Sequence, residues 1–308
     1  MQDDYKLSDE MHKKVLSTIE SGLFHNKHAS RHPQIYILGG QPAAGKGTLT
    51  SRIFSENPDE SFVSVNGDEY RLSHPAAQEI FNKHDKDFAA YTDPDVRVWT
   101  SEIFADAIKH RYNIIFEGTM RTNQICRTIE NLQQQGYGIN IMVMAVPEIK
   151  SRISIYSRYQ EQLDRYPIAR FTPKQSHDAA YTGMLNTLQE IEDKHLYDTI
   201  AVYNREGDCL FKTGDKGIVA AIEKERNKPL PTGEKIELND VCNDLLKKMY
   251  SRGEKQEFID DIKGLQKQLF ASSAGNMYFI QNNFEKIQKM KSQNKDSGPK
   301  YIDNSNSR

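Results

Sequence analysis

The most informative segment of this chain is Gly39-Gly40-Gln41-Pro42-Ala43-Ala44-Gly45-Lys46-Gly47-Thr48. A short apolar run at residues 35–38 precedes it and predicts a buried strand, and residues 49–54 predict the start of a helix. A strand, a glycine-bounded turn with a lysine, and a helix together make a phosphate-binding loop, in which backbone N–H groups and the helix N-terminus attract phosphate oxygens. The sequence therefore predicts that residues 40–48 bind a nucleoside triphosphate.

The order of residues after the lysine departs from the usual loop. Lys46 supplies a full positive charge for the β- and γ-phosphates, and the usual pattern places Ser or Thr directly after it as a magnesium ligand. Here Gly47 follows, and the hydroxyl comes one place later at Thr48, as in adenylate-kinase-like phosphotransferases. We take Thr48 as a candidate Mg²⁺ ligand. The alternative is a glycine-rich turn with a chance lysine.

Expected strands alternate with helical patterns from residue 33 to residue 225. The alternation predicts an α/β fold, a P-loop kinase-like parallel sheet with helices on both faces. The apolar runs predict strands at 35–38, 61–65, 113–116, 139–146, 199–203 and 209–211. The helical patterns cover 8–24 with Ser8 as N-cap, 74–84, 95–110 after a turn at 91–94, 124–135, 148–163, and a helix capped by Thr172 that runs to about 194. Within 95–110, Val98, Trp99, Ile103 and Ala107 are expected to face inward.

The pattern changes beyond Pro231, where amphipathic helices without strands are expected. We divide the chain into a kinase-like domain at 1–228, a helical extension at 229–291 and a disordered tail at 292–308. The extension is expected to form helices at 236–250, 254–270 and 276–290. In its first helix, Val241, Leu245, Leu246 and Tyr250 are expected to pack onto the kinase-like domain.

Polar residues follow the expected strands, where ligands bind in parallel sheets. Asp68 stands three residues past the second strand, where a carboxylate can take the proton of a substrate hydroxyl or merely cap a turn. Glu69 is its neighbouring competitor. Glu117 follows the third strand, where an acid often holds a magnesium-bound water, and Thr119 and Arg121 in the same turn are candidates to hold a polar or anionic substrate.

Arginines crowd the helix after the fourth strand and the loop that follows it. Arg152, Arg158, Arg165 and Arg170 are candidates to stabilise the charge of a transferring phosphoryl group, which spreads over its equatorial oxygens. The alternative for at least two of them is a solvated basic helix face.

Composition excludes several classes of protein. The formal net charge of −2 gives no field to recruit nucleic acid or a membrane surface, and the longest apolar run, 139–146, is too short to span a bilayer. The acidic N-terminus predicts no secretory signal, and three scattered cysteines form neither a metal motif nor a disulfide framework. We therefore expect a cytoplasmic protein that binds neither nucleic acid nor membrane.

At these residues the chain resembles the zeta toxin family, bacterial toxins of toxin–antitoxin systems. The resemblance covers about residues 8 to 250. It rests on motifs that occur in the same order: residues 38–42 with Gly45-Lys46, Asn66-Gly67-Asp68 with His74-Pro75, Glu117-Gly118-Thr119-Met120-Arg121, residues 143–147, Arg158-Tyr159, Ala169-Arg170 with 172–175, His177-Asp178, and residues 203–207.

The resemblance implies a reaction and its participants. The family uses ATP and Mg²⁺ to phosphorylate the 3′-hydroxyl of the amino sugar in UDP-N-acetylglucosamine, which blocks cell-wall precursor synthesis, and a small helical antitoxin is the implied partner. The family's phosphate lysine falls on Lys46 and its general base on Asp68. Its phosphate-stabilising arginines fall on Arg158 and Arg170.

The resemblance also implies the residues that bind the acceptor. The family's substrate-binding Thr and Arg fall on Thr119 and Arg121. Its substrate-binding glutamate falls at Ser101 or Glu102, of which we take Glu102. Two rival functions remain open: a kinase of the same fold that acts on another hydroxylated nucleotide or small molecule, and a nucleotide-binding interaction protein whose C-terminal helices carry the function.

Overall fold

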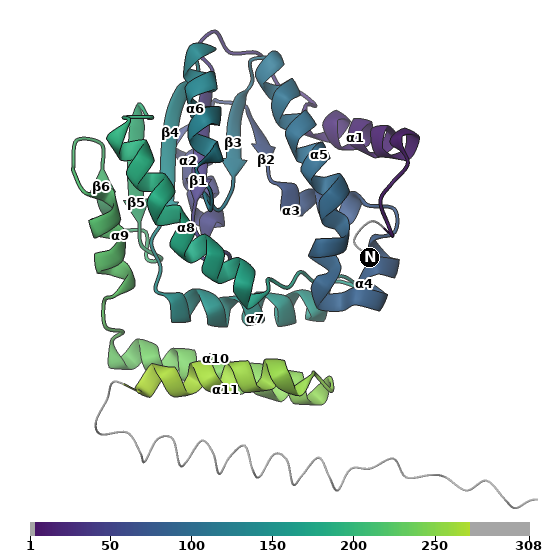
Figure 1. The fold of residues 1–308 in the computed structure, drawn as a ribbon, viewed down its shortest axis with the longest axis vertical. Coiled ribbons are helices and arrows are strands. Elements are labelled where there is room, and N and C mark those ends of the chain that lie inside the picture. Colours follow the sequence, from purple (N-terminus) through teal and green to yellow (C-terminus); the bar gives the residue numbers. More distant parts are fainter. Residues whose placement is uncertain (1–3, 272–308) are drawn as a thin grey trace, which may run out of the picture.

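The computed structural model describes residues 4–271, and a six-stranded sheet forms its centre (Figure 1). The strand order is β2-β3-β1-β4-β5-β6, in which β1 to β5 are parallel and β6 pairs antiparallel with β5. The strands are β1 (Gln34–Gly39), β2 (Phe62–Val65), β3 (Asn113–Glu117), β4 (Gly138–Met144), β5 (Thr199–Tyr203) and β6 (Cys209–Lys212). The predicted α/β sheet is confirmed, with β6 as an antiparallel edge.

Helices connect the strands and cover the sheet. They are α1 (Asp9–Leu23), α2 (Lys46–Glu56), α3 (Gly67–Tyr70), η1 (Arg71–Ser73), α4 (Ala77–His84), η2 (Asp85–Asp87), α5 (Phe88–Lys109), α6 (Gln124–Gln134), α7 (Glu148–Arg165), α8 (Lys174–Asp193), α9 (Ile218–Arg226), α10 (Thr232–Ser251) and α11 (Gln256–Phe270). The Ser8 side chain caps α1 as predicted, accepting a hydrogen bond from the Met11 N–H. Helix α1 lies outside α5 (Figure 1).

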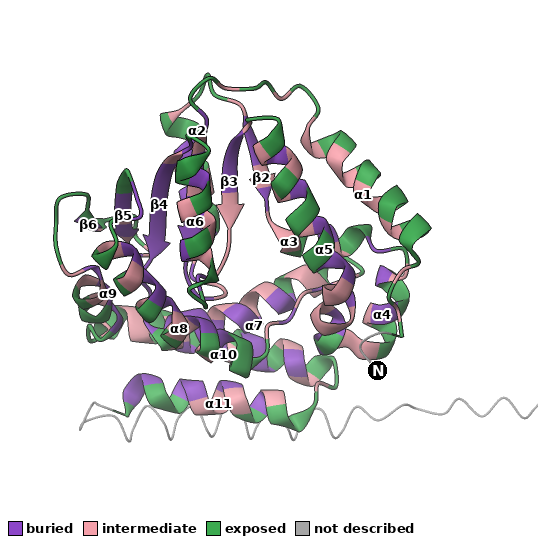
Figure 2. Cartoon of the chain, turned by 45° about the horizontal axis from the view of Figure 1, so that its top comes forward, coloured by how far each residue is buried: buried purple, intermediate pink, exposed green. Residues whose placement is uncertain are grey.

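Alternation along the strands divides the apolar residues between the two faces of the sheet. On β1, Ile35 and Ile37 join the cluster that includes residues of α5, α6 and α8. Leu38 joins the opposite cluster with Leu49 and Ile53 of α2. Strand β4 is buried over all but its first residue, as Figure 2 shows. Helices therefore cover both faces, and the loop after β1 is held between them.

The expectation of a turn at Tyr91–Pro94 is wrong, because these residues lie inside α5. Pro94 lacks the N–H that would bind the carbonyl of the residue four places back, which usually ends a helix. Burial of Phe88 before it and Trp99 after it holds the helix together across the proline. Trp99, Ile103 and Ala107 are buried as predicted, but Val98 is 44% exposed.

The expected cap of α8 is also wrong. The N-cap residue is Pro173, which has no side-chain capping bond. The hydroxyl of Thr172 instead accepts a hydrogen bond from Nη2 of Arg158 at 3.1 Å. A tertiary contact has therefore taken the side chain that local sequence assigned to a cap.

The C-terminal helices α10 and α11 pack against α7. Leu245 and Leu246 are buried in one cluster with residues of α7 and α11, as predicted, whereas Val241 is 37% exposed. The division at residue 228 stays a prediction, and the shared cluster shows that α10 and α11 rest on the rest of the chain. The helix expected at 276–290 and the tail at 292–308 lie outside the described residues.

Across residues 4–271, no helix is both long enough and apolar enough to cross a bilayer.

Candidate active site

A cavity of about 850 Å³ lies beyond the carboxyl ends of β1, β2 and β3. The loop after β1, the first turns of α5, helix α7 and the segment 166–173 enclose it. This is where ligands bind in parallel α/β sheets. It brings together these residues that the sequence predicted for the site: Pro42, Ala43, Gly45, Lys46, Gly47, Asp68, Glu117, Thr119, Arg121, Arg158 and Arg170.

The backbone of the phosphate-binding loop is held in the conformation that a phosphate cradle needs. Gly45, the N-cap of α2, has φ +98°, and Gly40 has φ +147°, both in the region that favours glycine. Ala43 adopts φ 59° although it has a side chain. Its carbonyl accepts a hydrogen bond from Nη2 of Arg205 at 2.5 Å, which helps to hold the strained turn.

Lys46 folds back over the loop. Its side chain is 9% exposed, and Nζ donates to the carbonyls of Gly40 at 3.1 Å and Gln41 at 3.4 Å. The Glu117 carboxylate is 3.8 Å away. Burial lowers the pKa of Lys46, and the charge of Glu117 offsets part of that shift. Because its partners are two neutral carbonyls and a carboxylate 3.8 Å away, Nζ is placed to exchange them for phosphate oxygens.

Gln41 anchors the loop from below and does not line the cavity. It is fully buried, and its amide donates to the Val146 carbonyl at 2.8 Å and to the Ser151 hydroxyl at 3.3 Å. Its carbonyl oxygen accepts from Nη2 of Arg226 at 3.1 Å. The side chain of Gln41 is therefore a structural anchor, and only its backbone remains available to phosphate.

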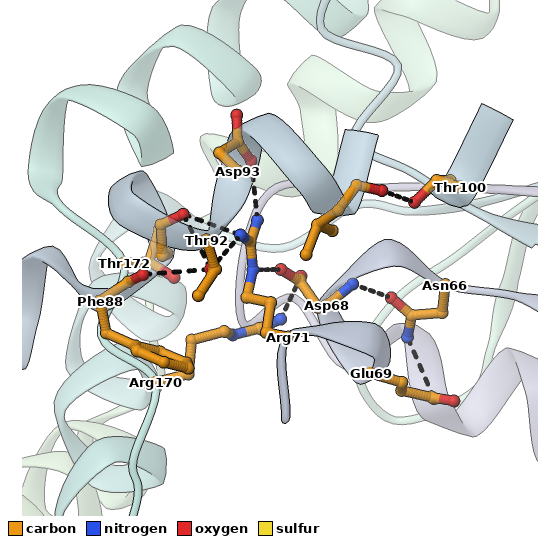
Figure 3. Close-up of polar contacts among 12 residues, drawn as sticks. Asn66, Asp68, Glu69, Arg71, Phe88, Thr92, Asp93, Thr100, Arg170 and Thr172 are labelled. Atoms are coloured by element: carbon orange, nitrogen blue, oxygen red, sulfur yellow. Dashed lines mark hydrogen bonds and ion pairs between the residues drawn. The ribbon is translucent and has the colours of Figure 1, made fainter. Parts of the chain in front are cut away.

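Asp68 lies between two guanidinium groups (Figure 3). Oδ1 accepts a hydrogen bond from Nε of Arg71 at 3.0 Å, and Oδ2 forms an ion pair with Arg170. Burial raises the pKa of Asp68, but the charges of Arg170 and Arg71 outweigh it and hold the pKa below its usual value. The carboxylate is therefore ionised at neutral pH, and it lines the cavity with both oxygens held by arginines.

Arg158 and Arg170 reach the cavity from α7 and from the segment after it. Burial and the charge of Arg170 lower the pKa of Arg158 to about 10. Nε of Arg158 is buried and has no hydrogen-bond partner in residues 4–271. Such a group is costly to leave unpaired, so the site is built for an anion that supplies the missing acceptor. Of the other predicted arginines, Arg152 is bound by Asp261 and Arg165 is exposed.

Thr119 and Arg121 enter the cavity from the loop after β3. Arg121 is exposed, and its backbone carbonyl lies against Gly183 of α8, where a Cβ atom would come within 2.2 Å of it. The loop after β3 therefore packs closely against α8, and this contact holds the backbone of Arg121 in place.

Some predicted residues are not brought to the cavity. Glu102 lies on another side of α5, 46% exposed, with Oε2 at 3.4 Å from Nε2 of His12 on α1. Ser101, the other position that the resemblance left open, does not line the cavity either; the α5 residues that do are Ala89, Ala90, Asp93, Pro94 and Arg97. The Thr48 hydroxyl donates to the Gly45 carbonyl at 2.8 Å and does not line the cavity, and neither do Gly40 and Ala44.

Several cavity residues were missed at the sequence level. They are Arg71, Lys86, Asp87, Ala89, Ala90, Asp93, Pro94, Arg97, Ser154, Phe171, Thr172, Pro173 and Ser176. Arg71 had the clearest signal, since it follows Asp68 by three residues in a helical turn and such pairs lie on one face.

The donor set of the cavity fits ATP better than a free metal ion. Lys46, Arg158 and Arg170 provide charge and hydrogen-bond donors for phosphate oxygens. Within residues 4–271 no group of three or more His, Cys, Asp or Glu side chains is arranged to hold a metal. Magnesium needs only one or two carboxylates when substrate phosphates supply the other ligands, and Glu117 fits that part.

Comparison with known proteins identifies the family of this chain and supports its fold. The family model described as zeta toxin matches residues 20–216. Toxin zeta of Streptococcus pyogenes is 33% identical over 232 residues, covering 72% of this chain and 80% of the relative. Toxin PezT of Streptococcus pneumoniae is 28% identical over 216 residues, covering 70% and 85%.

Solved structures share the fold. A structure from the PezAT chromosomal toxin–antitoxin system of Streptococcus pneumoniae superposes with a TM-score of 0.68 at 23% identity, covering 80% of this chain and 99% of that chain. The AvrRxo1-ORF1:AvrRxo1-ORF2 structure with ATP gives a TM-score of 0.55 at 11% identity, covering 83% and 88%. The family model and the identity to toxin zeta, together with the phosphate loop and the arginine-flanked Asp68, show that the chain belongs to the zeta toxin family.

Proposed function

We propose that this chain transfers the γ-phosphate of ATP to the 3′-hydroxyl of the amino sugar in UDP-N-acetylglucosamine or a related UDP-sugar. As a zeta toxin family member it is a kinase-like toxin of a toxin–antitoxin system. One observation carries the proposal: the carboxylate of Asp68 lines the same cavity as the cations Lys46, Arg158 and Arg170. Nucleotide binding alone needs the loop and its lysine, but a base beside phosphate ligands serves transfer to an acceptor.

In the proposed mechanism the cations hold the triphosphate. The backbone of residues 40–48 and Nζ of Lys46 bind the β- and γ-phosphates. Nε of Arg158, which has no partner within residues 4–271, donates a hydrogen bond to a phosphate oxygen. Arg170 turns from Asp68 toward the phosphate as charge moves onto the equatorial oxygens. Glu117, which lines the cavity, is the residue proposed to hold Mg²⁺, and the ion would neutralise phosphate charge. Thr48 would join it only if its hydroxyl leaves the Gly45 carbonyl, to which it donates here.

Asp68 then acts on the acceptor. Oδ2 is released from the ion pair with Arg170, while Oδ1 stays bound to Arg71. The freed oxygen accepts the proton of the acceptor hydroxyl as that hydroxyl attacks the γ-phosphorus. Thr119 and Arg121 orient the acceptor from the neighbouring loop after β3. In this scheme the pKa of Asp68 rises when Arg170 leaves it, which makes the carboxylate a better base only when ATP is bound.

A second acceptor class is favoured by one observation. Glu102, assigned to the UDP-sugar by family resemblance, contacts His12 and stands outside the cavity. The other position that the resemblance allowed is Ser101, which has no carboxylate to accept hydrogen bonds from the sugar. A kinase of the same fold that acts on another hydroxylated nucleotide or small molecule is therefore the second candidate.

The experiment that tests the proposal incubates the protein with ATP, Mg²⁺ and a panel of UDP-sugars, nucleotides and aminoglycosides. Mass spectrometry detects phosphorylated products. A product 80 mass units heavier from UDP-N-acetylglucosamine, absent with Asp68→Asn, supports the proposal, and phosphorylation of a different acceptor favours the second candidate. Binding of ATP without any product would favour a nucleotide-binding interaction protein. Co-expression with a small helical antitoxin tests the proposed partner, since it should relieve growth arrest.

A further inference from the structure

The C-terminal helix α11 lies behind one wall of the cavity, outside the residues that the family model matches. Phe258, in its first turn, contacts the ring of Phe171 edge to face at 5.4 Å between centroids. Phe171 belongs to the segment 166–173 and lines the cavity. A residue of the extension is thus one contact away from the proposed site of phosphoryl transfer.

Phe171 sits between the two residues of this segment that touch the proposed catalytic groups. Arg170, on one side, pairs with Asp68. Thr172, on the other, accepts a hydrogen bond from Arg158 at 3.1 Å. Phe171 is only 6% exposed, so its ring is packed into the protein between these two neighbours.

An aromatic cluster around Phe171 joins three parts of the chain. Tyr156 and Tyr159 of α7 contact the ring at centroid distances of 5.2 and 5.5 Å, and Phe258 closes the cluster from α11. Nζ of Lys86 lies 4.7 Å from the centroid of Tyr159 and 4.5 Å from that of Phe258. Removing Phe258 would therefore open one side of the cluster.

Two partly buried ion pairs hold α11 and the residues before it in the same place. Nζ of Lys86 is 2.6 Å from Oε2 of Glu254, which lies two residues before the start of α11. Nη2 of Arg152 donates to both carboxylate oxygens of Asp261 at 2.6 and 2.7 Å, and the Tyr156 hydroxyl donates to Oδ2 at 2.8 Å. These polar contacts tie α11 to α7 through Asp261 and tie the residues before α11 to η2 through Lys86.

We propose that α11 is a working part of the catalytic unit, in which Phe258 and Glu254 are positioning residues that hold segment 166–173 against the cavity. The inference rests on the proposed function only for the role of Arg170 in phosphate binding. The physical effect, a fixed segment, is independent of the reaction. Without the contact, Arg170 and Thr172 would sample conformations away from Asp68 and Arg158, and transfer would slow while the phosphate loop still bound ATP.

The test compares matched variants of the full chain. Phe258→Ala removes the ring behind Phe171, and Glu254→Gln removes the charge partner of Lys86 without opening the apolar cluster. Leu269→Ala is the control, because Leu269 is buried in the same cluster but lies 11 residues further along α11, about 16 Å away. Hydrogen exchange of segment 166–173 is measured by mass spectrometry. The Arg170 N–H, which donates to Oε1 of Gln162 at 2.8 Å, is the most informative amide.

We expect exchange in segment 166–173 to rise about tenfold in Phe258→Ala and less in Glu254→Gln, with no local rise in Leu269→Ala. In the transfer assay, kcat should fall about tenfold in Phe258→Ala while KM for ATP stays near that of the parent. Equal exchange in Phe258→Ala and Leu269→Ala would overturn the proposal, since the effect would then be general loss of stability. Because exchange needs no turnover, an inactive parent protein would defeat the proposed function and leave this test intact.

Discussion

Nε of Arg71 donates a hydrogen bond to Oδ1 of Asp68 at 3.0 Å, and the rest of the same guanidinium holds the start of α5. Nη1 donates to the Ala89 carbonyl and the Thr92 hydroxyl, and Nη2 donates to Oδ1 of Asp93 (Figure 3). The planar guanidinium of arginine holds its N–H donors in fixed directions and can make all these hydrogen bonds at once, whereas the ammonium group of a lysine cannot. One side chain therefore ties the proposed base to the opposite wall of the cavity.

Asp68→Asn should keep the fold and ATP binding but lower phosphoryl transfer by about 10²-fold or more, because the amide cannot take a proton. Calorimetry with ATP and a product assay on the same preparation measure the two effects. Glu69→Gln is the matched control, since Glu69 is adjacent but does not line the cavity. Product formation that survives in Asp68→Asn and fails in Glu69→Gln would move the role of base to Glu69.

The pH dependence of transfer should reveal the arginines around Asp68. A carboxylate whose pKa is held below its usual value stays ionised at neutral pH, and its function is lost only as the pH falls through that lowered pKa. Arg71→Gln removes a positive charge, so the pKa of Asp68 rises and the acid limb of kcat/KM moves to higher pH. Arg165→Gln, a change at an exposed arginine, should leave the limb in place.

Carboxyl carbon NMR of Asp68 in the free protein gives the same comparison without turnover. An unchanged Asp68 titration in Arg71→Gln would mean that Arg71 does not set this pKa.

Lys46→Ala should abolish ATP turnover while the chain remains folded. In this structure Nζ donates to two loop carbonyls, at 3.1 and 3.4 Å. We expect the loss of these two contacts to affect folding less than the loss of the Nζ charge affects phosphate binding. A phosphate contact in the transition state is worth more than ~1.4 kcal/mol, so turnover should fall by more than about tenfold. Lys174→Ala, at an exposed lysine paired with Asp178, controls for loss of charge. Turnover within about tenfold of the parent would refute the assigned role.

Gly183→Ala and Gly264→Ala should have opposite effects, although both replace a glycine inside a helix. A Cβ at residue 183 would meet the Arg121 carbonyl at 2.2 Å, whereas a Cβ at residue 264 meets nothing within 4 Å. We expect Gly264→Ala to raise the free energy of unfolding by about 0.5–1 kcal/mol. Gly183→Ala should lower it by about 1–3 kcal/mol and raise KM for the acceptor, since the loop that carries Arg121 must move. Thermal denaturation and acceptor titration measure both, and a neutral Gly183→Ala would show that the loop adapts.

The sequence by itself determined the phosphate loop, the sheet and the residues at the strand ends. A strand, a turn that requires glycine at Gly40 and Gly45, and a helix are local features, so neighbouring residues suffice to specify them. The strand ends were predictable as well, because parallel strands bring their carboxyl ends to one edge. Asp68, Glu117 and Arg121 could therefore be expected in one cavity before any contact was known.

The partners of these residues, in contrast, depend on how the whole chain packs. Pro94 stays inside α5 because buried residues on both sides outweigh its local preference, and Thr172 binds Arg158 instead of capping α8. Glu102 contacts His12 of α1 and does not line the cavity, because the packing of the whole of α5 determines which way each of its side chains faces. The contact of Phe258 with Phe171 joins residues 87 positions apart, and no local pattern encodes such a pair, because side chains so distant in sequence meet only when the complete core forms.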